Sequence, residues 1–279
     1  MRTLHFDSLS ACVDDTRRPF NRATNTRRFN STVVNRRDDS SWFGVEGGSP
    51  AVANMVEFTG YPEGGRMISA MSDSLQATLP PALGIRRKKR RADSGDEYDI
   101  HSAMRGAHDR AWTQSHRELR HGLGVVRIIV DICGDAAKRA NALQWRGVAG
   151  ITLCTMLRQA GYSVEIVAAL GVINAFKQET LLWTCIVNSR HGSVDIDSLA
   201  AVLALPGFFR TYGFAGIIRA ADNFKSDAAD GLGYPVPVSN IYEPRGDCIE
   251  LIVPNEVLDE DKARDWINES IALLQGDTA

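Results

Sequence analysis

A run of β-branched residues at positions 125–130 constrains the fold of this chain more than any other segment. Its sequence, VVRIIV, is typical of a strand that is buried on both faces. The long apolar segment 140–160 follows and stops at Gly161, which is the pattern of a helix closed by a C-terminal glycine. Residues 162–170 then predict a second strand. A strand, a helix and a strand in this order predict a parallel β–α–β unit.

The remaining C-terminal sequence extends this alternation. We predict a third strand over 180–188, a helix over 195–209 interrupted at Pro206, a late strand over 248–253 and a closing helix over 259–274. Residues 211–247 stay open, because GFAGIIRAA fits an edge strand or a helix and the segment after it is loop-like. The expected fold of residues 123–279 is an α/β domain with a doubly wound, mainly parallel sheet.

Composition is that of an ordinary globular protein, with 279 residues, 44% apolar and 24% charged. No window approaches the 18 uninterrupted apolar residues of a membrane span, and the N-terminus lacks the apolar core of a secretory signal. These features predict a cytoplasmic protein without membrane contact. The 5 cysteines lack a CxxC pair, which favours reduced thiols over a zinc site or disulfides.

Charge is distributed unevenly along the chain. Residues 1–122 carry 19 Lys and Arg against 15 Asp and Glu, a net charge of +4, and residues 123–279 carry 13 against 19, a net charge of −6. Basic side chains release counterions from phosphate backbones, so the upstream region is the expected nucleic-acid contact. The alternative is a solvated arm whose field is offset by the acidic residues that follow the basic run. The candidate basic residues are Arg17, Arg18, Arg27, Arg28, Arg86, Arg87, Lys88, Lys89, Arg90 and Arg91.

Two regions precede the α/β domain. Residues 1–48 are polar with spaced aromatics, which predicts an arm that is extended or wraps the body, with Phe20 and Phe29 available to stack on unpaired bases. Residues 49–122 predict a helical extension that contains the basic run 86–91. Its expected helices start at Pro50, cover 66–76, and cover 96–121 either as one amphipathic helix or as a pair interrupted near Gly106.

The loop after the first buried strand is the expected site, because ligands in doubly wound folds bind at the carboxyl ends of the strands. The loop reads Asp131-Ile132-Cys133-Gly134-Asp135. A single glycine between two carboxylates disfavours phosphate binding and hence a nucleotide-dependent enzyme. Cys133 is a candidate nucleophile only if a histidine lies beside it, and the sequence places none there.

The segment VVRIIVDICGDAAKRANALQWRGVAGITLCTMLRQAGYSVEIVAALG resembles the opening of a von Willebrand factor A (vWA) domain. In that family an Asp-x-Ser-x-Ser loop holds Mg²⁺ for partner binding. Asp131 matches the Asp, whereas Cys133 and Asp135 stand at the two Ser positions. The resemblance therefore implies a degenerate site in which Asp131 and Asp135 remain as the oxygen ligands for any metal. Asp195 and Asp197 are the nearest acidic candidates for a later ligand position.

Upstream segments such as SSWFGVEGG and EFTGYPEGG are similar to segments found before vWA-like domains in uncharacterised proteins of bacterial viruses and mobile elements. That similarity implies a virus-encoded accessory protein in the host bacterial cytoplasm. The expected function is a non-catalytic adaptor without a cofactor, which recruits a polymerase or replication factor to nucleic acid, single-stranded DNA among the candidates. Asp131, Cys133 and Asp135 would contact the protein partner.

Three other classes stay open at this point. They are a Mg²⁺-dependent vWA interaction module, an enzyme that uses the Cys133 thiol or a nucleotide, and a structural protein whose arm reaches onto a neighbouring subunit.

Overall fold

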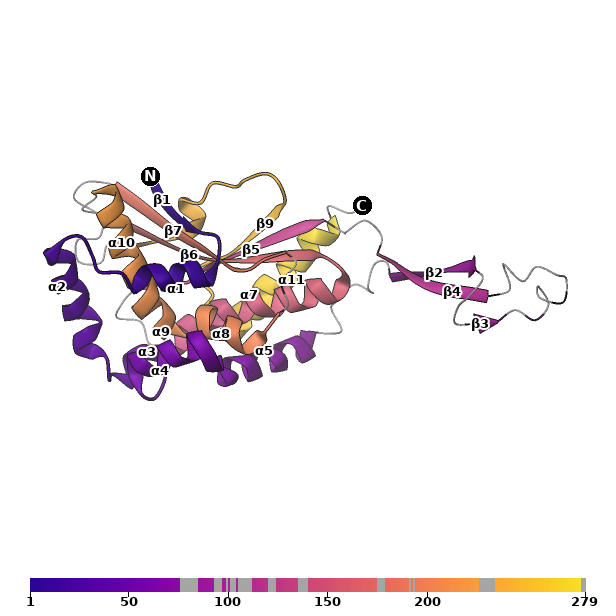
Figure 1. Cartoon of the computed structure of the whole chain (residues 1–279), viewed down its shortest axis with the longest axis horizontal. Helices are drawn as coiled ribbons and strands as arrows, with labels where there is room; N and C mark the ends of the chain where they lie inside the picture. The colour runs from indigo at the N-terminus through magenta and orange to yellow at the C-terminus, as the bar shows by residue number, and fades with distance from the viewer. Residues whose placement is uncertain are drawn as a thin grey trace.

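The structure, a computed structural model of the chain, describes residues 1–75, 85–92, 97–98, 100, 104, 112–119, 124–134, 140–174, 179–190, 192, 194–225 and 234–276. A six-stranded, mostly parallel sheet forms its centre, with helices packed against it (Figure 1). The expected class, a doubly wound α/β fold with a mainly parallel sheet, is confirmed. A separate three-stranded sheet stands away from this body in Figure 1.

The central sheet has the order β1-β7-β6-β5-β9, and β8 pairs with β6. Its strands are β1 (Arg2–Phe6), β5 (Val125–Asp131), β6 (Ser163–Asn174), β7 (Glu179–Asn188), β8 (Tyr234–Val236) and β9 (Ile249–Val253). β5 runs parallel to both neighbours, with Ile128 opposite Ile166 of β6 and Leu251 of β9. The predicted strand, helix and strand over 125–170 are confirmed.

One connection departs from the predicted alternation. β7 pairs with β6 in the antiparallel direction, with Leu170 opposite Trp183. Only four residues, 175–178, separate the two strands, and a parallel crossover needs about a dozen or more. The spacing alone therefore requires a hairpin at this point.

One face of the sheet packs against the helices, and the large hydrophobic core lies between them. Helix α7 (Ala140–Ala160) is buried along most of its length and ends at Gly161, whose φ of +99° is the left-handed conformation that glycine adopts readily. The other elements of this layer are α3 (Ser40–Phe43), α4 (Gly48–Asn54), the π-helical turn η2 (Met55–Thr59), α5 (Pro62–Leu75), α8 (Ile196–Leu203), α9 (Pro206–Phe208), the π-helical turn η5 (Phe209–Gly213), α10 (Phe214–Phe224) and α11 (Glu260–Gly276).

The opposite face of the sheet is covered in part by the chain that contains the 3-10 turn η7 (Val238–Asn240). Val238 packs with Ile129, Val167 and Ala169 in a second, smaller apolar cluster, against which Tyr242 also lies. The loop-like sequence predicted around these residues thus has a fixed place, because it buries apolar side chains of the two central strands.

The N-terminal region is part of the body. β1 pairs in parallel with β7, with Leu4 opposite Trp183, and α1 (Leu9–Thr16) and α2 (Ala23–Thr32) follow, with the short turn η1 (Val34–Arg36) after them. Residues 1–48 were expected to form an extended or wrapping arm, whereas they contribute a strand to the same sheet as residues 123–279. Parallel pairing with β7 satisfies the backbone hydrogen-bonding groups of β1. The local sequence pattern of residues 1–48 does not reveal this distant partner strand.

The second sheet has the order β2-β4-β3, with β2 (Ile85–Ala92), β3 (Glu97–Tyr98) and β4 (Trp112–Leu119). One helix or a pair of helices was expected over 96–121, and the strands β3 and β4 in this range correct that prediction. Ile100 and Met104, between the two strands, have helical backbone. Strand pairing outweighs local helix propensity here. The helices predicted from Pro50 and over 66–76 are present as α4 and α5.

Among the described residues, no single helix has the length and apolarity of a membrane span. The bent pair Ile196–Leu203 and Pro206–Phe224 passes that test by length and composition only.

Candidate functional site

The carboxyl end of β5 lies at the point where the order of the sheet reverses. The chain leaves β5, passes through α7 and returns as β6 on one side, whereas β9 lies on the other side of β5. Ligands of open α/β sheets bind in the crevice at such a point. Asp131 is the last residue of β5, so the structure places the predicted loop at the expected position of the sheet.

Asp131 faces inward at this position and is 1% exposed. Its Oδ1 accepts a hydrogen bond from the backbone N–H of Cys133 at 2.9 Å, and its Oδ2 accepts one from the N–H of Val238 at 3.0 Å. Burial raises the pKa of Asp131 to about 6, although Arg146 and these two N–H groups act in the opposite direction. The carboxylate therefore fastens the strand-end turn to the segment that covers the sheet.

Arg146 of α7 supplies the positive charge of this site. Its side chain is buried, and Nη1 donates to the backbone oxygens of Asp131 at 2.6 Å and Cys133 at 2.5 Å. The same nitrogen lies 3.7 Å from Oδ1 of Asp131. Burial lowers the pKa of Arg146, and the neighbouring Asp131 opposes that effect. One guanidinium thus compensates the buried carboxylate and satisfies two carbonyl groups of the loop.

Cys133 is enclosed beside them. Its side chain is 4% exposed, and Sγ donates to the backbone oxygen of Gly171 at 3.5 Å. Burial, together with the negative charge of Asp131, raises the pKa of the thiol far above its ordinary value. The thiolate that nucleophilic catalysis requires is therefore disfavoured at neutral pH.

The described residues of the strand-end site do not fit Mg²⁺. A hard cation needs several accessible oxygen ligands, whereas Asp131 is enclosed, both its oxygens accept backbone hydrogen bonds, and a guanidinium lies beside it. The neutral thiol of Cys133 is a poor ligand for Mg²⁺. Asp135, the second carboxylate of the predicted set, lies outside the described residues.

The prediction that these side chains contact a protein partner also needs correction. Asp131 and Cys133 are buried by the chain itself, so neither reaches the surface of the described structure. The sequence pattern located the strand end, and it missed Arg146, which lies one helical turn and a half inside α7. An arginine directly before the long apolar stretch 147–154 of this helix was the available signal.

The N-terminal candidates for nucleic-acid contact are mostly engaged within the protein. Arg17 pairs with Glu57, and Arg18 lies 3.9 Å from Asp15. Phe20 and Phe29 pack on each other with ring centroids 5.5 Å apart. The guanidinium of Arg219 lies 4.9 Å from the centroid of the Phe20 ring, and Phe29 also packs against the main core. The two half-buried phenylalanines therefore contribute to the packing of the N-terminal helices, and their stacking on bases stays a prediction.

The other two N-terminal arginines differ from each other. Arg28 donates to Oδ1 of Asn25 at 3.2 Å, whereas Arg27 is exposed on α2. Arg27 is therefore the N-terminal candidate that remains available to a phosphate.

The basic run forms the strand β2, which pairs with β4 along its whole length. The register sets Arg86 opposite Glu118 and Arg87 opposite Arg117. β3 pairs with the other side of β4, so Glu97 is two strand spacings, about 10 Å, from β2. Asp93, Asp96 and Asp99, which also follow the basic run, lie outside the described residues.

A second polar cluster, which the sequence did not predict, crosses the other end of the central strands. Arg127 of β5 donates to Glu165 of β6 at 2.6 Å and to Glu250 of β9 at 2.5 Å. Arg127 also donates to Asp247 at 3.2 Å, and Arg190 donates to the same carboxylate at 2.9 Å. Burial lowers the pKa of Arg127, but its hydrogen bonds to these carboxylates outweigh burial and raise it.

Three ligand atoms of this region, from Asp247, Cys248 and Glu250, lie within 4.8 Å of one another. Arg127 already binds the carboxylates of Asp247 and Glu250. The cluster is therefore explained as a charge-compensated link between three strands, and it gives no independent indication of a metal ion.

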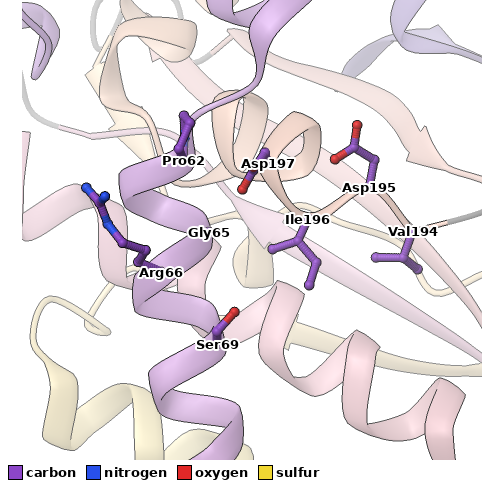
Figure 2. A pocket seen from close by; sticks show the side chains of 8 residues that line it. All are labelled: Pro62, Gly65, Arg66, Ser69, Val194, Asp195, Ile196 and Asp197. Carbon is purple, nitrogen blue, oxygen red and sulfur yellow. The ribbon is translucent and has the colours of Figure 1, made fainter.

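An open hollow of about 750 Å³ lies between the N-terminal ends of α5 and α8 (Figure 2). Asp195 caps α8 by accepting from the N–H of Ser198 at 3.3 Å and from its hydroxyl at 2.6 Å. The backbone oxygen of Asp197 accepts from the N–H of Tyr61 at 2.8 Å. In Figure 2 the guanidinium of Arg66 lies on the side of α5 away from Asp195. Asp195 and Asp197 therefore have structural roles here, and the charged groups of the hollow do not converge.

These features define the class of the protein: an α/β protein with a closed, internally compensated strand-end site and a separate basic sheet. A family described as a domain of unknown function (DUF7192) matches residues 2–272, so the chain belongs to that family. No curated protein and no solved structure matches the chain.

Proposed function

We propose that the protein is a non-catalytic adaptor that binds nucleic acid through the sheet β2-β4-β3 and a protein partner through its α/β body. In this proposal it is a virus-encoded accessory protein of the host cytoplasm, and it brings a polymerase or replication factor to nucleic acid. The body would be a vWA-like domain with a degenerate metal site.

The charge of the second sheet is the observation that carries the nucleic-acid part. Its three strands contain seven basic residues, namely Arg86, Arg87, Lys88, Lys89, Arg90, Arg91 and Arg117, and two acidic residues, Glu97 and Glu118. Pairing with β4 fixes six of these basic residues in one strand at regular spacing. A surface of this kind attracts a polyanion through counterion release, whatever its sequence.

The body supports an adaptor role in two ways. The order of β5 ending in Asp131, helix α7, Gly161 and β6 is that of the vWA resemblance. The strand-end site is filled by Arg146 and by the chain around Val238, which leaves little room for a substrate there. The raised pKa of Cys133 weighs against the thiol enzyme that stayed open at the sequence level.

Fluorescence anisotropy of labelled oligonucleotides over a salt series tests the nucleic-acid part. The test variant carries glutamine at positions 86–91, and the control carries glutamine at three exposed basic residues of the body that are not candidates for nucleic-acid contact, Arg37, Arg245 and Lys262. Each lost phosphate contact reduces the slope of log K against log salt by about 0.7 to 0.9, so the loss of three to six contacts reduces it by about 2 to 5. We expect that reduction in the test variant and a much smaller one in the control.

Equal affinities and salt slopes for wild type and the 86–91 variant would contradict the proposal. The protein-partner part is tested separately, by capture of a polymerase or replication factor on the full chain. The 86–91 variant should still capture that partner, because β2 lies outside the central sheet.

A further inference from the structure

An aromatic pair lies at one end of the second sheet. Tyr98 of β3 is directly opposite Trp112 of β4, and the ring centroids are 4.8 Å apart with the planes tilted by 55°. Tyr98 is 48% exposed and Trp112 is half-buried. Neither residue belongs to the hydrophobic clusters of the body. An aromatic pair placed beside solvent in this way is available to contact a ligand.

Strand register places this pair on the same face as half of the basic run. Directly paired residues share a face, and residues alternate between faces along a strand. Ala92 is opposite Trp112, so positions 90, 88 and 86 of β2 fall on the aromatic face. These positions are Arg90, Lys88 and Arg86, with a step of about 6.6 Å between neighbours, and they lie opposite Gln114, His116 and Glu118 of β4.

The other face has a different character. Its register positions are Arg87, Lys89 and Arg91 on β2, opposite Arg117, Ser115 and Thr113 on β4, with Glu97 on β3. It carries basic residues and no aromatic residue among these described positions. The two faces therefore share the attraction for phosphate, and only one of them adds ring surface.

We propose that the face containing Tyr98, Trp112, Arg90, Lys88 and Arg86 binds single-stranded nucleic acid, with unpaired bases stacked on the two rings. This assignment rests on the proposed function and specifies its ligand. Bases of a duplex are stacked on each other and do not offer their faces to a protein ring. Unpaired bases do, and stacking on aromatic side chains tolerates any base sequence. The basic residues at positions 86, 88 and 90 form a row along β2 that ends beside the rings, so they can bind the phosphates of a strand whose bases stack there.

The first experiment uses the wild-type protein and changes the ligand. A labelled single strand is compared by anisotropy with an abasic strand of the same length, which keeps the sugar-phosphate chain and lacks the bases, and with a duplex. DNA and RNA versions of the single strand distinguish the two sources of unpaired bases. We expect the abasic strand and the duplex to bind about tenfold or more weakly than the single strand, with a similar salt slope for the two single strands.

The second experiment changes the rings. Tyr98→Ala and Trp112→Leu should each weaken single-strand binding by about tenfold and leave duplex binding and the salt slope unchanged. Phe58→Ala is the matched control, because Phe58 is an 80% exposed aromatic residue on the body. The single strand should quench tryptophan fluorescence less in Trp112→Leu than in wild type. This measurement reports contact with the Trp112 ring itself, which the affinity alone does not report.

The outcomes separate the two proposals. Equal binding of the normal and abasic strands overturns the stacking assignment and leaves nucleic-acid binding by charge intact. Absence of binding to any oligonucleotide at low salt overturns the proposed function and the stacking assignment together. A ring variant that unfolds in urea at a lower midpoint is set aside, and the abasic comparison on wild type then decides.

Discussion

Replacement of Arg146 by methionine tests whether this guanidinium compensates the buried carboxylate of the strand-end site. Methionine keeps most of the apolar stem and removes the charge. The structure predicts that Arg146→Met leaves the carboxylate of Asp131 buried without its cation and the backbone oxygens of Asp131 and Cys133 without their donor. The free energy of unfolding should fall accordingly.

The expected size follows from these contacts. Removal of one partner of a buried ion pair costs about 3 to 5 kcal/mol, because the other charge stays buried and uncompensated. Both side chains of this pair are 2% exposed, so solvent does not screen the loss. Without Arg146, which lowers the pKa of Asp131, that pKa rises above its value of about 6 and the carboxyl can take up a proton at pH 7, so we expect a cost at the lower end, about 3 kcal/mol.

Urea unfolding at pH 7, followed by circular dichroism, measures this loss for Arg146→Met, Asp131→Asn and the double variant. Asparagine keeps an acceptor for the N–H groups of Cys133 and Val238 and removes the negative charge. Because the double variant contains no uncompensated charge, its stability should exceed the additive expectation by about 1 to 3 kcal/mol. Additive losses of stability in the cycle, or a loss below about 1 kcal/mol for Arg146→Met, would refute the conclusion that Arg146 compensates the buried charge of Asp131.

The remaining predictions concern pH, metal and helix packing. Since the pKa of Asp131 is about 6 in the folded protein against an ordinary value of 3.8, its contribution is full below pH 3.8 and is lost as pH rises through 6. The stability difference between wild type and Asp131→Asn should therefore change by about 3 kcal/mol across that range in pH-dependent unfolding. The melting temperature of wild type should be the same in Mg²⁺ and in EDTA, and a shift of several degrees would contradict the absence of a fit for the metal. A Cβ at Gly147 would lie 2.2 Å from the backbone carbonyl of Leu203. Gly147→Ala should therefore lower the free energy of unfolding by about 2 kcal/mol or more, although alanine has the better helix propensity. Ser69→Ala on α5 is the exposed control.

Local sequence patterns predicted the elements that obey a single period. The strand over 125–130 and the helix over 140–160 are each recognisable by largely apolar character, because most of their residues are buried. The choice between a strand and a helix at GFAGIIRAA stayed open in the sequence, and packing resolves it as α10, whose residues Phe214 to Asp222 are buried. A short apolar run carries too little periodicity for that decision.

Long-range pairing is what local patterns left out. β1 at the N-terminus gains its partner from β7, about 180 residues later, and nothing near Arg2–Phe6 signals that partner. The same reason applies to the strand end: the motif located Asp131, whereas its partners Arg146 and Val238 come from a helix and from a segment 107 residues further on. Whether a carboxylate is free or compensated depends on such distant groups.

The second sheet is a case where pairing opposes electrostatics, and this opposition makes its stability depend on the ligand. Arg87 is directly opposite Arg117, and like charges in that position destabilise a strand pair by about 0.2 to 1 kcal/mol. Six consecutive basic residues add repulsion along β2 itself. A bound polyanion removes this repulsion, so nucleic acid should stabilise the paired form of β2 more than it stabilises the body.

Hydrogen exchange followed by mass spectrometry measures that difference. At a ligand concentration of about 100 times Kd, binding to the paired form alone adds up to about 2.7 kcal/mol, which slows exchange up to about 100-fold. We expect slower exchange in peptides that cover 85–92 and unchanged exchange in peptides from α7, which serve as the internal control. Equal slowing in both sets indicates that the oligonucleotide binds the body, and unchanged exchange in 85–92 indicates that β2 is not the contact. Either result would remove the basic sheet from the proposed function. A sheet that holds like charges together should be stabilised most by the ligand that neutralises those charges, so a true contact must slow exchange more in 85–92 than in α7.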